Sequence, residues 1–348
     1  MIGLMSGTSL DGLDICDVVF KPIEGNWVFD ICHAETITYP IELKQSLKIA
    51  FFWSEEEVER LDRIYSEYLC DEVLKFIDTH QIKEIDAVSS HGHTIWHQPD
   101  RGFTKQIGNQ FFVAQRTGLT WVCDFRVADI ALGGQGAPLV PIGDQLLFTE
   151  YDYCLNLGGF ANLSFSLSND RVAYDICAVN VVLNRLAQSL NMDYDKDGST
   201  ARGGHYDKDL LFELNAMAYY QKPYPKSLGI EWVENILWPI IERYKIPIAD
   251  KMATYVDHVA QQIGTALVGN RGDILVTGGG AKHQFLMDRI AFHAKQNLTI
   301  PELQIVDFKE AIIFAFLGVL RLRNEFNCLK NVTGASNDHS SGNIFLKP

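Results

Sequence analysis

Apolar and polar positions near the amino terminus predict a β-hairpin. Residues 1–5 form a short apolar run, residues 6–12 are mostly small, hydroxylated or glycine, and apolar positions resume at Leu13, Ile15 and 18–20. Two apolar runs separated by such a turn are typical of paired antiparallel strands. Glycines let a ligand approach the backbone, while N–H groups and hydroxyls donate to phosphate oxygens. The turn is therefore a candidate phosphate-binding site, although an ordinary hairpin turn shows the same pattern.

Two carboxylates at this turn change the interpretation. Asp11 and Asp14 would repel a bare phosphate, so they indicate an intervening cation, most simply Mg²⁺. Asp11 is the candidate metal ligand, either directly or through a water molecule.

The pattern further along the chain predicts strands and helices in alternation. Apolar residues recur at helical spacing over 54–79 and again over 252–267, where Asp250 could cap the helix. The other expected elements are strands at 84–90, 120–125, 273–277 and 303–306, and a long apolar helix at 310–322.

A second strand–turn–strand unit at 153–166 repeats the layout of the first. Gly158 and Gly159 form its turn, and Asn162 and Ser164 follow directly. The amino-acid sequences of the two units differ too much to prove that one is a duplicate of the other. Their shared layout nevertheless hints at two related halves of the chain. A third glycine turn, Gly278–Gly280, ends the strand expected at 273–277.

These turns indicate an α/β fold with ligand sites at strand ends. None of them matches the P-loop or dinucleotide fingerprint. Glycine hairpins in two similar halves fit the two-domain actin-like ATPase (ribonuclease H-like) plan, with an interdomain cleft. We expect a first domain at 1–127 plus about 333–348, and a second at 128–332.

Length and composition agree with a two-domain globular protein. The chain has 348 residues, of which 47% are hydrophobic and 21% charged. A net charge of −14 argues against broad attraction to nucleic acid or anionic membranes. Seven widely spaced cysteines without a CxxC pair favour a reducing compartment, and no stretch has membrane-spanning or signal-peptide character. We expect a cytoplasmic protein.

The run Gly3–Asp14 closely resembles the signature of the anhydro-N-acetylmuramic acid kinases. Further stretches of the same resemblance follow in family order at 90–97, 106–109, 124–126, 129–141, 156–164, 194–197, 225–227, 277–280, 310–311 and 332–335. There are two departures. The family's Asp-Thr-Gly-Pro-Gly-Asn segment is Asp175-Ile-Cys-Ala-Val-Asn180 here, and His93 replaces the usual glutamine. The first departure puts the loop's backbone and hydroxyl contacts in doubt but keeps the carboxylate.

The resemblance implies that ATP and water convert 1,6-anhydro-N-acetylmuramic acid to N-acetylmuramic acid 6-phosphate and ADP, a step of murein sugar recycling. Such a site needs a carboxylate that activates water against the anomeric carbon, as in an inverting glycosidase. It also needs donors and a metal to spread the charge of the transferred phosphoryl group. The departing O6 needs no acid, because phosphorus captures it.

Asp175 is the candidate base, since it follows an apolar run and should lie at a strand end. The common alternative for an aspartate before a helix is an N-cap or turn role. Glu310 resembles a second carboxylate that positions the water, and its alternative role is to stabilise the start of a helix. Both residues are assigned as catalytic.

Arg126 and His91 resemble residues that bind the sugar, and we add Thr8 and Asn180 to this group. An arginine is more often an ion-pair partner, here of Asp124 or Asp129. His91, His93 and His97 lack a neighbouring carboxylate that would complete a zinc site. The residues assigned to ATP are Ser6, Gly7, Thr8, Ser9, Leu10, Asp11, Gly12, Asp14, Gly158, Gly159, Asn162, Gly278, Gly279 and Gly280. We expect the phosphates between the two hairpin turns.

Two other functions remain open from the sequence. One is an ordinary sugar kinase in which Asp175 deprotonates a free hydroxyl of the substrate. The other is a non-catalytic nucleotide-binding sensor, which the altered 175–180 loop keeps open. One fold can host all three functions. The expected partners are ATP and a small sugar, with a homodimer left open.

Overall fold

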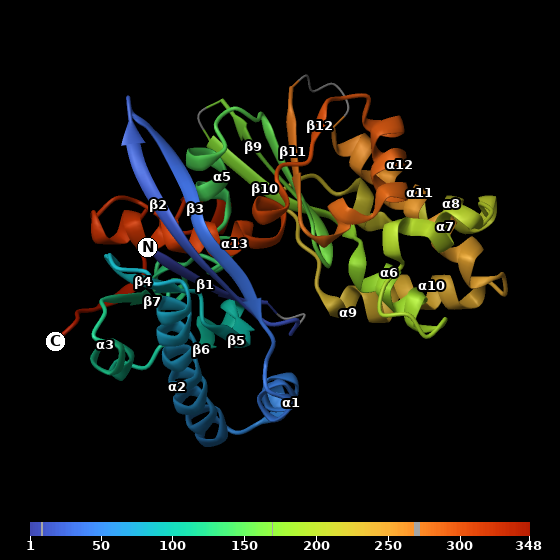
Figure 1. Ribbon diagram of the computed structural model, residues 1–348. Helices are drawn as coiled ribbons and strands as arrows, with labels where there is room; N and C mark the ends of the chain where they lie inside the picture. The colour runs from blue at the N-terminus through green and yellow to red at the C-terminus, as the bar shows by residue number, and fades with distance from the viewer. Residues whose placement is uncertain (8–9, 169, 268–271) are drawn as a thin grey trace. The chain divides into compact units, whose positions relative to one another are not determined.

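The computed structural model describes residues 1–7, 10–168, 170–267 and 272–348 (Figure 1). They form two compact units, the first comprising 1–148 and 308–348 and the second 149–307. The sequence analysis expected the divisions at 127/128 and 332/333 instead. Residues 128–148 and 308–332 belong to the first unit because α5 packs against β3, and α13 contacts β1 and β4 through Gly3 and Ser89.

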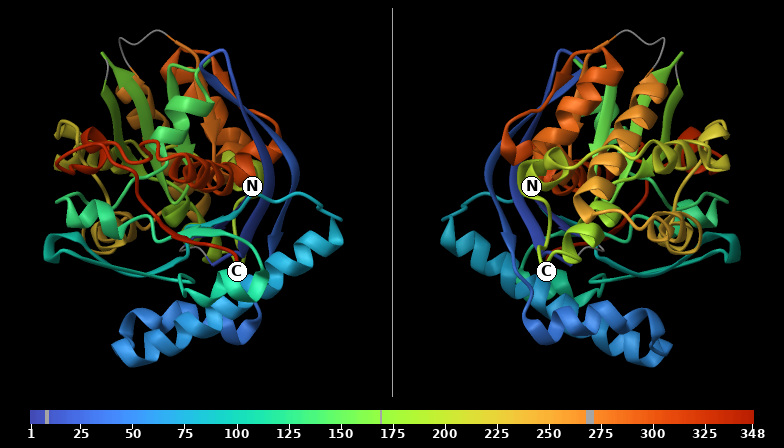
Figure 2. Two further views of the ribbon diagram at one scale, coloured as in Figure 1. Left: turned by 90° about the vertical axis from the view of Figure 1, so that its left-hand side faces the viewer. Right: turned by 90° about the vertical axis from the view of Figure 1, so that its right-hand side faces the viewer.

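A six-stranded sheet forms the framework of the first unit. Its strands in spatial order are β13 (Asn343–Phe345), β7 (Trp121–Cys123), β4 (Val88–Ser90), β1 (Ile2–Ser6), β2 (Leu13–Ile23) and β3 (Asn26–Ile37). The neighbours β1–β2 and β2–β3 are antiparallel, whereas β1–β4 and β4–β7 are parallel. The carboxyl-terminal strand β13 pairs antiparallel with β7. The red carboxyl-terminal segment accordingly runs back to the blue and teal elements of the first unit (Figure 2). A separate ribbon joins β5 (His93–Gln98) to β6 (Phe103–Ile107).

The long helix α2 illustrates how local sequence fixes an element of this unit. It begins after Ser54, whose side chain accepts from the Glu57 N–H while the Glu57 carboxylate accepts from the Ser54 N–H. This capping box satisfies two donors that a helix start otherwise leaves unpaired. A helix here was expected from apolar residues at helical spacing, and the observed helix buries Leu61, Tyr65 and Leu69 in the core. The helices of this unit are α1 (Ile41–Ile49), η1 (Ala50–Phe52), α2 (Glu55–Thr79), η2 (Pro99–Arg101), α3 (Phe112–Thr117), α4 (Val127–Ala131), α5 (Pro141–Leu147), most of α13 (Leu303–Leu322) and α14 (Lys330–Thr333).

The second unit is built on a five-stranded sheet. Its strands in spatial order are β10 (Asp170–Ala178), β9 (Phe160–Leu167), β8 (Tyr153–Leu157), β11 (Ile274–Thr277) and β12 (Leu298–Thr299). The first three strands are antiparallel neighbours, and β8, β11 and β12 run parallel. This is the order and direction of β3–β2–β1–β4–β7 in the first unit. The repeated topology confirms the predicted α/β fold of actin-like ATPase type.

Helices bury the second sheet. The helix α11 (Ile248–Leu267) has most of its side chains in the core, and its Tyr255 hydroxyl donates to the carbonyl of Ala178 at 2.8 Å. The remaining helices are α6 (Asn180–Gln188), η3 (Lys196–Gly198), α7 (Ser199–Gly203), α8 (Lys208–Asn215), η4 (Ala218–Gln221), α9 (Ile230–Trp232), η5 (Val233–Leu237), α10 (Trp238–Arg243), η6 (Gly279–Lys282) and α12 (Gln284–Ala294).

Two expected boundaries were wrong. The stretch 303–306 is the beginning of α13 rather than a strand, so that Glu310 lies inside this helix and does not open it. The helix α11 begins at Ile248, which places Asp250 in its first turn rather than at its cap. The Asp250 carboxylate accepts instead from the His205 N–H at 2.7 Å. In the described ranges, no helix is long and apolar enough to cross a membrane.

Candidate functional site

The candidate site residues divide between the two units, and each group has its own geometry. In the second unit, Asn156 is the register partner of Asn162, and Asn162 is the partner of Asp175. Register partners on neighbouring strands project from the same face of a sheet. The three polar side chains therefore form a row across β8, β9 and β10. Sequence reasoning missed Asn156, although period-two spacing within the motif 156–164 could have indicated it.

A β-bulge fixes the place of Asp175 on this row. The register of β10 against β9 shifts between Asp175 and Cys177. A bulge bends its strand and redirects a side chain, and bulges recur beside active sites. Asp175 thus lies three residues before the end of β10, not at the strand end as expected. The helix α6 begins only at Asn180, so the N-cap alternative for Asp175 is wrong.

The segment 226–228 holds the Asp175 carboxylate and backbone. The Leu228 N–H donates to Asp175 Oδ2 at 2.9 Å, and the Asp175 N–H donates to the Lys226 carbonyl at 3.1 Å. The Tyr219 hydroxyl donates to the Asp175 carbonyl at 2.6 Å. Burial raises the pKa of the Asp175 carboxyl, and the Leu228 N–H partly opposes this. The carboxylate is therefore a stronger base than a solvated aspartate.

The turn Gly158–Gly159 is closed against the start of α6. The Val179 N–H donates to the Gly159 carbonyl at 2.8 Å, and the Asn180 N–H donates to the Gly158 carbonyl at 3.3 Å. The Asn180 side-chain amide donates to the Leu157 carbonyl at 3.1 Å. Asn180, which we assigned to the sugar, therefore supports the glycine turn in this structure.

The third glycine turn lies directly beside this one, because β8 and β11 are neighbours. A Cβ at Gly278 would lie 2.6 Å from Asn156 Oδ1, and one at Gly280 would lie 2.8 Å from the Leu157 Cβ. Gly278 also has φ of +84°, in the region that favours glycine. The structure thus brings Gly158, Gly159, Asn162 and Gly278–Gly280 together in one unit.

In the first unit, Arg126 pairs with His91. Its Nε and Nη2 lie 3.1 and 2.9 Å from His91 Nε2, and His91 Nδ1 lies 2.9 Å from the Gly92 carbonyl. His91 therefore accepts at Nε2 and donates from Nδ1. Burial, followed by the Arg126 charge, holds the pKa of His91 well below its usual value. Burial also lowers the pKa of Arg126 to about 10, against the effect of Glu310.

The ion-pair alternative for Arg126 is not what the structure shows. The Asp124 carboxylate accepts from Asn343 at 2.9 Å. The Asp129 carboxylate accepts from the Gly136 N–H at 2.7 Å and the Thr333 hydroxyl at 2.6 Å. Both aspartates thus have other partners.

Glu310 is exposed on α13, beside a buried ion pair between Lys309 and Asp144 at 2.7 Å. Desolvation by the surrounding protein raises the pKa of the Glu310 carboxyl, and the Lys309 charge opposes this most strongly. One turn further along α13, the Phe314 ring lies 4.7 Å from that of His91, measured between centroids. The same helix therefore presents Glu310 and supports the Arg126–His91 pair.

The first hairpin contains a closed polar network at Ser6. The Tyr39 hydroxyl donates to Ser6 Oγ at 2.6 Å, and Ser6 Oγ lies 2.8 Å from His93 Nδ1. Burial lowers the pKa of His93 to about 4, so the ring is neutral at neutral pH. The departure from the family pattern at His93 thus gives Ser6 a buried partner.

The other hairpin residues assigned to ATP lie around the turn. Leu10 is buried, Gly7 is half-buried and Asp11 is exposed. A Cβ at Gly12 would lie 2.6 Å from the Ile37 carbonyl oxygen. The Thr36 hydroxyl donates to Asp14 Oδ1 at 2.6 Å. Thr8 and Ser9 lie outside the described residues.

Comparison with known proteins places this chain in a family. A sequence model of the anhydro-N-acetylmuramic acid kinase family matches residues 1–347. The protein of that name from Aliivibrio fischeri is 35% identical over 99% of this chain and 98% of its own length. The one from Pasteurella multocida is 33% identical over 99% of this chain and 96% of its own length.

Solved structures with lower similarity include an activator of 2-hydroxyisocaproyl-CoA dehydratase from Clostridium difficile with bound ADPNP. It is 14% identical, with a TM-score of 0.43 over 90% of this chain and 95% of that one. A ROK family glucokinase from Streptomyces griseus is 13% identical, with a TM-score of 0.37 over 84% of this chain and 88% of that one. From the match over its full length and from its sequence relatives, the chain belongs to the anhydro-N-acetylmuramic acid kinase family.

Proposed function

We propose that this protein is an ATP-dependent kinase that opens 1,6-anhydro-N-acetylmuramic acid with water and phosphorylates O6. The products are N-acetylmuramic acid 6-phosphate and ADP, as in murein sugar recycling. Family membership over the whole chain supports the reaction, and the geometry of Asp175 supports its mechanism. Because the reaction consumes ATP, we place it in the cytoplasm.

The observation that carries the mechanism is the environment of the Asp175 carboxylate. One of its oxygens is fixed by the Leu228 N–H, burial raises its pKa, and it neighbours Asn162 beside a glycine turn. In the proposed step, Asp175 takes a proton from water while the water oxygen bonds to C1 of the sugar. The C1–O6 bond breaks, and O6 bonds to the γ-phosphorus as the bond to ADP breaks. Asp175 then returns its proton to solvent.

We assign the phosphates of ATP to the turns around Gly158–Gly159 and Ser6–Gly12, and the nucleoside to Gly278–Gly280. Glycines in a turn let a ligand approach the backbone N–H groups closely. Mg²⁺ fits Asp11, which is exposed, and Asp14, which is held by Thr36, because Mg²⁺ binds through one or two carboxylates together with substrate phosphates and water. Bound there, the ion would neutralise charge on the transferred phosphoryl group.

Arg126, His91 and Glu310 form the sugar-directed group of the first unit. Arg126 carries the positive charge and can bind the sugar's carboxylate or hydroxyl oxygens, while neutral His91 orients the guanidinium through Nε2. Glu310 remains exposed and can accept a hydrogen bond from the reacting water. One N–H of the Asn180 amide donates to the Leu157 carbonyl, so the amide oxygen and the second N–H are left for sugar binding.

Substitution of Asp175 by asparagine tests the proposal. Asparagine can still accept from the Leu228 N–H but cannot take a proton, so turnover should fall by about 10²–10⁴-fold with sugar binding retained. Asp170→Asn is the matched control, since Asp170 is exposed at the start of the same strand. The readouts are ADP formation that depends on the anhydro-sugar, and sugar affinity by calorimetry. Near-normal turnover in Asp175→Asn would remove this residue from the mechanism.

A further inference from the structure

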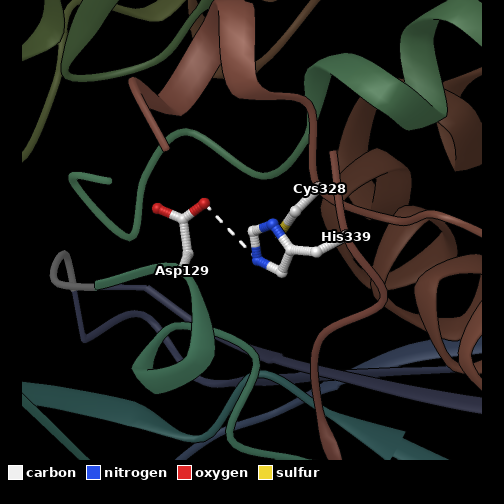
Figure 3. A group of neighbouring side chains, drawn as sticks. All are labelled: Asp129, Cys328 and His339. Atoms are coloured by element: carbon white, nitrogen blue, oxygen red, sulfur yellow. Dashed lines mark ion pairs between the residues drawn. The ribbon is translucent and has the colours of Figure 1, made fainter. Parts of the chain in front are cut away.

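A second group of reactive side chains lies in the first unit and has no part in the proposed reaction. Asp129, Cys328 and His339 are all buried, and one candidate ligand atom of each lies within 4.8 Å of the other two (Figure 3). Asp129 comes from α4, whereas Cys328 and His339 come from the carboxyl-terminal segment. Among the described residues, this is the one group of three such side chains.

The backbone holds two of these residues in register. Cys328 and His339 form an isolated antiparallel bridge. The Cys328 N–H donates to the His339 carbonyl at 3.1 Å, and the His339 N–H donates to the Cys328 carbonyl at 3.2 Å. Residues paired in this way project their side chains to the same side. Their relative position is therefore set before any ligand binds.

The third residue is equally constrained. The Gly136 N–H donates to Asp129 Oδ2, and the Thr333 hydroxyl donates to Asp129 Oδ1. Hydrogen bonds of this kind orient ligating carboxylates in metal sites. Gly134 passes so close to Asp129 Oδ2 that a side chain there would collide with it. The carboxylate has one defined position.

The ring of His339 provides the independent sign of a ligand. His339 Nδ1 lies 3.1 Å from the Asn337 carbonyl, so this nitrogen carries the proton in the neutral ring and leaves a lone pair on Nε2. His339 is only 7% exposed, and its Nε2 has no hydrogen-bond partner among the described residues. A histidine that donates one ring nitrogen to a carbonyl and presents the other is arranged as metal ligands are.

The distance between His339 Nε2 and Asp129 Oδ1 favours a bound metal ion over a proton shared by these two atoms. His339 Nε2 faces Asp129 Oδ1 at 3.6 Å. A hydrogen bond between a charged donor and a carboxylate spans about 2.7–2.9 Å. Nitrogen and oxygen ligands at about 2.0–2.1 Å from one tetrahedral ion stand about 3.4 Å apart. The observed gap is close to the second value.

We propose that Asp129, Cys328 and His339 bind a divalent transition metal, with Zn²⁺ as the best match to a sulfur, nitrogen and oxygen donor set. The thiolate and the carboxylate together neutralise a 2+ charge, which makes the ion tolerable in a buried place. A fourth position is left for water. The ion ties α4 and the loop at Gly136 to the carboxyl-terminal segment, and so supports the helix that begins just after Arg126.

Cobalt binding to the full-length protein tests this site. Cys32 is the one exposed cysteine of the chain, so Cys32→Ser serves as the parent to remove adventitious binding. After treatment with chelator, the parent should bind one Co²⁺ per chain and show sulfur-to-cobalt charge-transfer absorption. Cys328→Ser should lose this absorption, and His339→Gln should weaken binding by at least about tenfold. Cys70→Ser, which alters another buried thiol of the same unit, should behave like the parent.

Thermal unfolding supplies a second readout. Zn²⁺ should raise the unfolding midpoint of the parent and of Cys70→Ser but not that of His339→Gln, because only a metal bound to the native state stabilises it. Should Cys328→Ser fail to fold, the parent and His339→Gln still decide the outcome. Absence of stoichiometric cobalt binding in the parent would overturn the proposal. So would charge-transfer absorption that persists in folded Cys328→Ser, or a cobalt affinity that is unchanged in folded His339→Gln.

Discussion

The two units carry the same three-stranded meander but place their carboxylates differently on it. In each unit we compare the residues that lie one register pair away from the turn of the hairpin. In the first unit this row consists of Met5, Asp14 and Thr36 on β1, β2 and β3. The second unit has Asn156, Asn162 and Asp175 across β8, β9 and β10. Asp14 thus corresponds in position to Asn162, and Thr36 corresponds to Asp175.

The difference shows how one scaffold supplies two kinds of carboxylate. Asp14 lies on the middle strand and accepts from the neighbouring Thr36 hydroxyl, which suits an anion that holds a cation in place. Asp175 lies on the third strand beside a bulge, and its pKa is raised by burial. A carboxylate in that setting suits proton abstraction. Asp14 and Asp175 belong to corresponding rows of the two sheets, and the residues around each carboxylate decide whether it suits cation binding or proton abstraction.

The largest effect in the hairpin of the first unit is expected from Asp14→Asn. If Asp14 helps to hold Mg²⁺, its loss should raise the Mg²⁺ concentration needed for half-maximal activity by about 10–100-fold. The control is Asp30→Asn, which removes an exposed carboxylate from the strand β3 of the same sheet. Titration of activity with Mg²⁺ measures the effect. An unchanged Mg²⁺ requirement would contradict the role of this row in metal binding.

A glycine substitution sharpens the comparison at the turns themselves. In Gly12→Ala the new methyl group would lie 2.6 Å from the Ile37 carbonyl oxygen, so β2 and β3 must shift apart. We expect a loss of unfolding free energy of about 1–3 kcal/mol, measured by urea denaturation. Gly203→Ala is the control, because a Cβ there would meet no atom within 4 Å. Equal stability of the two variants would show that the β2–β3 approach imposes no constraint.

Asn162→Asp would make the second row resemble the first. It would place a carboxylate directly opposite Asp175, and such like-charged pairs cost about 0.2–1 kcal/mol. The pKa of Asp175 should rise further, because a neighbouring negative charge favours its protonated form. The acid limb of kcat/KM against pH should therefore move to higher pH. Asn156→Ala, which changes the row without adding charge, should leave the limb in place.

The smallest expected effect is on stability against pH. Burial raises the pKa of Asp175 in the folded state, so ionising it costs stability. This cost is absent below the ordinary aspartate pKa, grows as pH rises toward the raised pKa, and is complete above it. Asp175→Asn should therefore be more stable than the parent at neutral pH, with a difference that shrinks in acid. A difference that is constant across this range, measured by urea denaturation, would contradict the assigned pKa direction.

Local signals in the sequence predicted the hairpins, the glycine turns and α2, because short turns and the helical spacing of apolar residues act over a few positions. Asp175 became the candidate base through the family resemblance rather than through a local signal. The bulge beside Asp175 could not be predicted, since it depends on the pairing of β10 with β9. The start of α13 was missed because the short apolar pattern of 303–306 fits a strand or a helix equally.

Contacts between residues that are far apart in the chain could not be predicted from the sequence either. His91 satisfies Arg126 although 35 positions separate them, and the two aspartates near Arg126 in sequence bond elsewhere. The group of Asp129, Cys328 and His339 joins a helix to a segment about 200 positions away, through contacts that only the folded chain creates. The sequence analysis included Asp129 in the family-like stretch 129–141 and as an alternative partner for Arg126, not as a metal ligand.

The central claim is that Asp175 readies water for attack on the anomeric carbon while O6 takes the phosphoryl group. Its most direct test is the reaction of ATP with 1,6-anhydro-N-acetylmuramic acid in ¹⁸O-water, quenched before mutarotation exchanges the anomeric oxygen. We predict one ¹⁸O atom at the anomeric carbon of each product molecule, with none in the phosphate. Phosphorylated product without solvent oxygen at that carbon would contradict the account and indicate an ordinary kinase acting on a free hydroxyl.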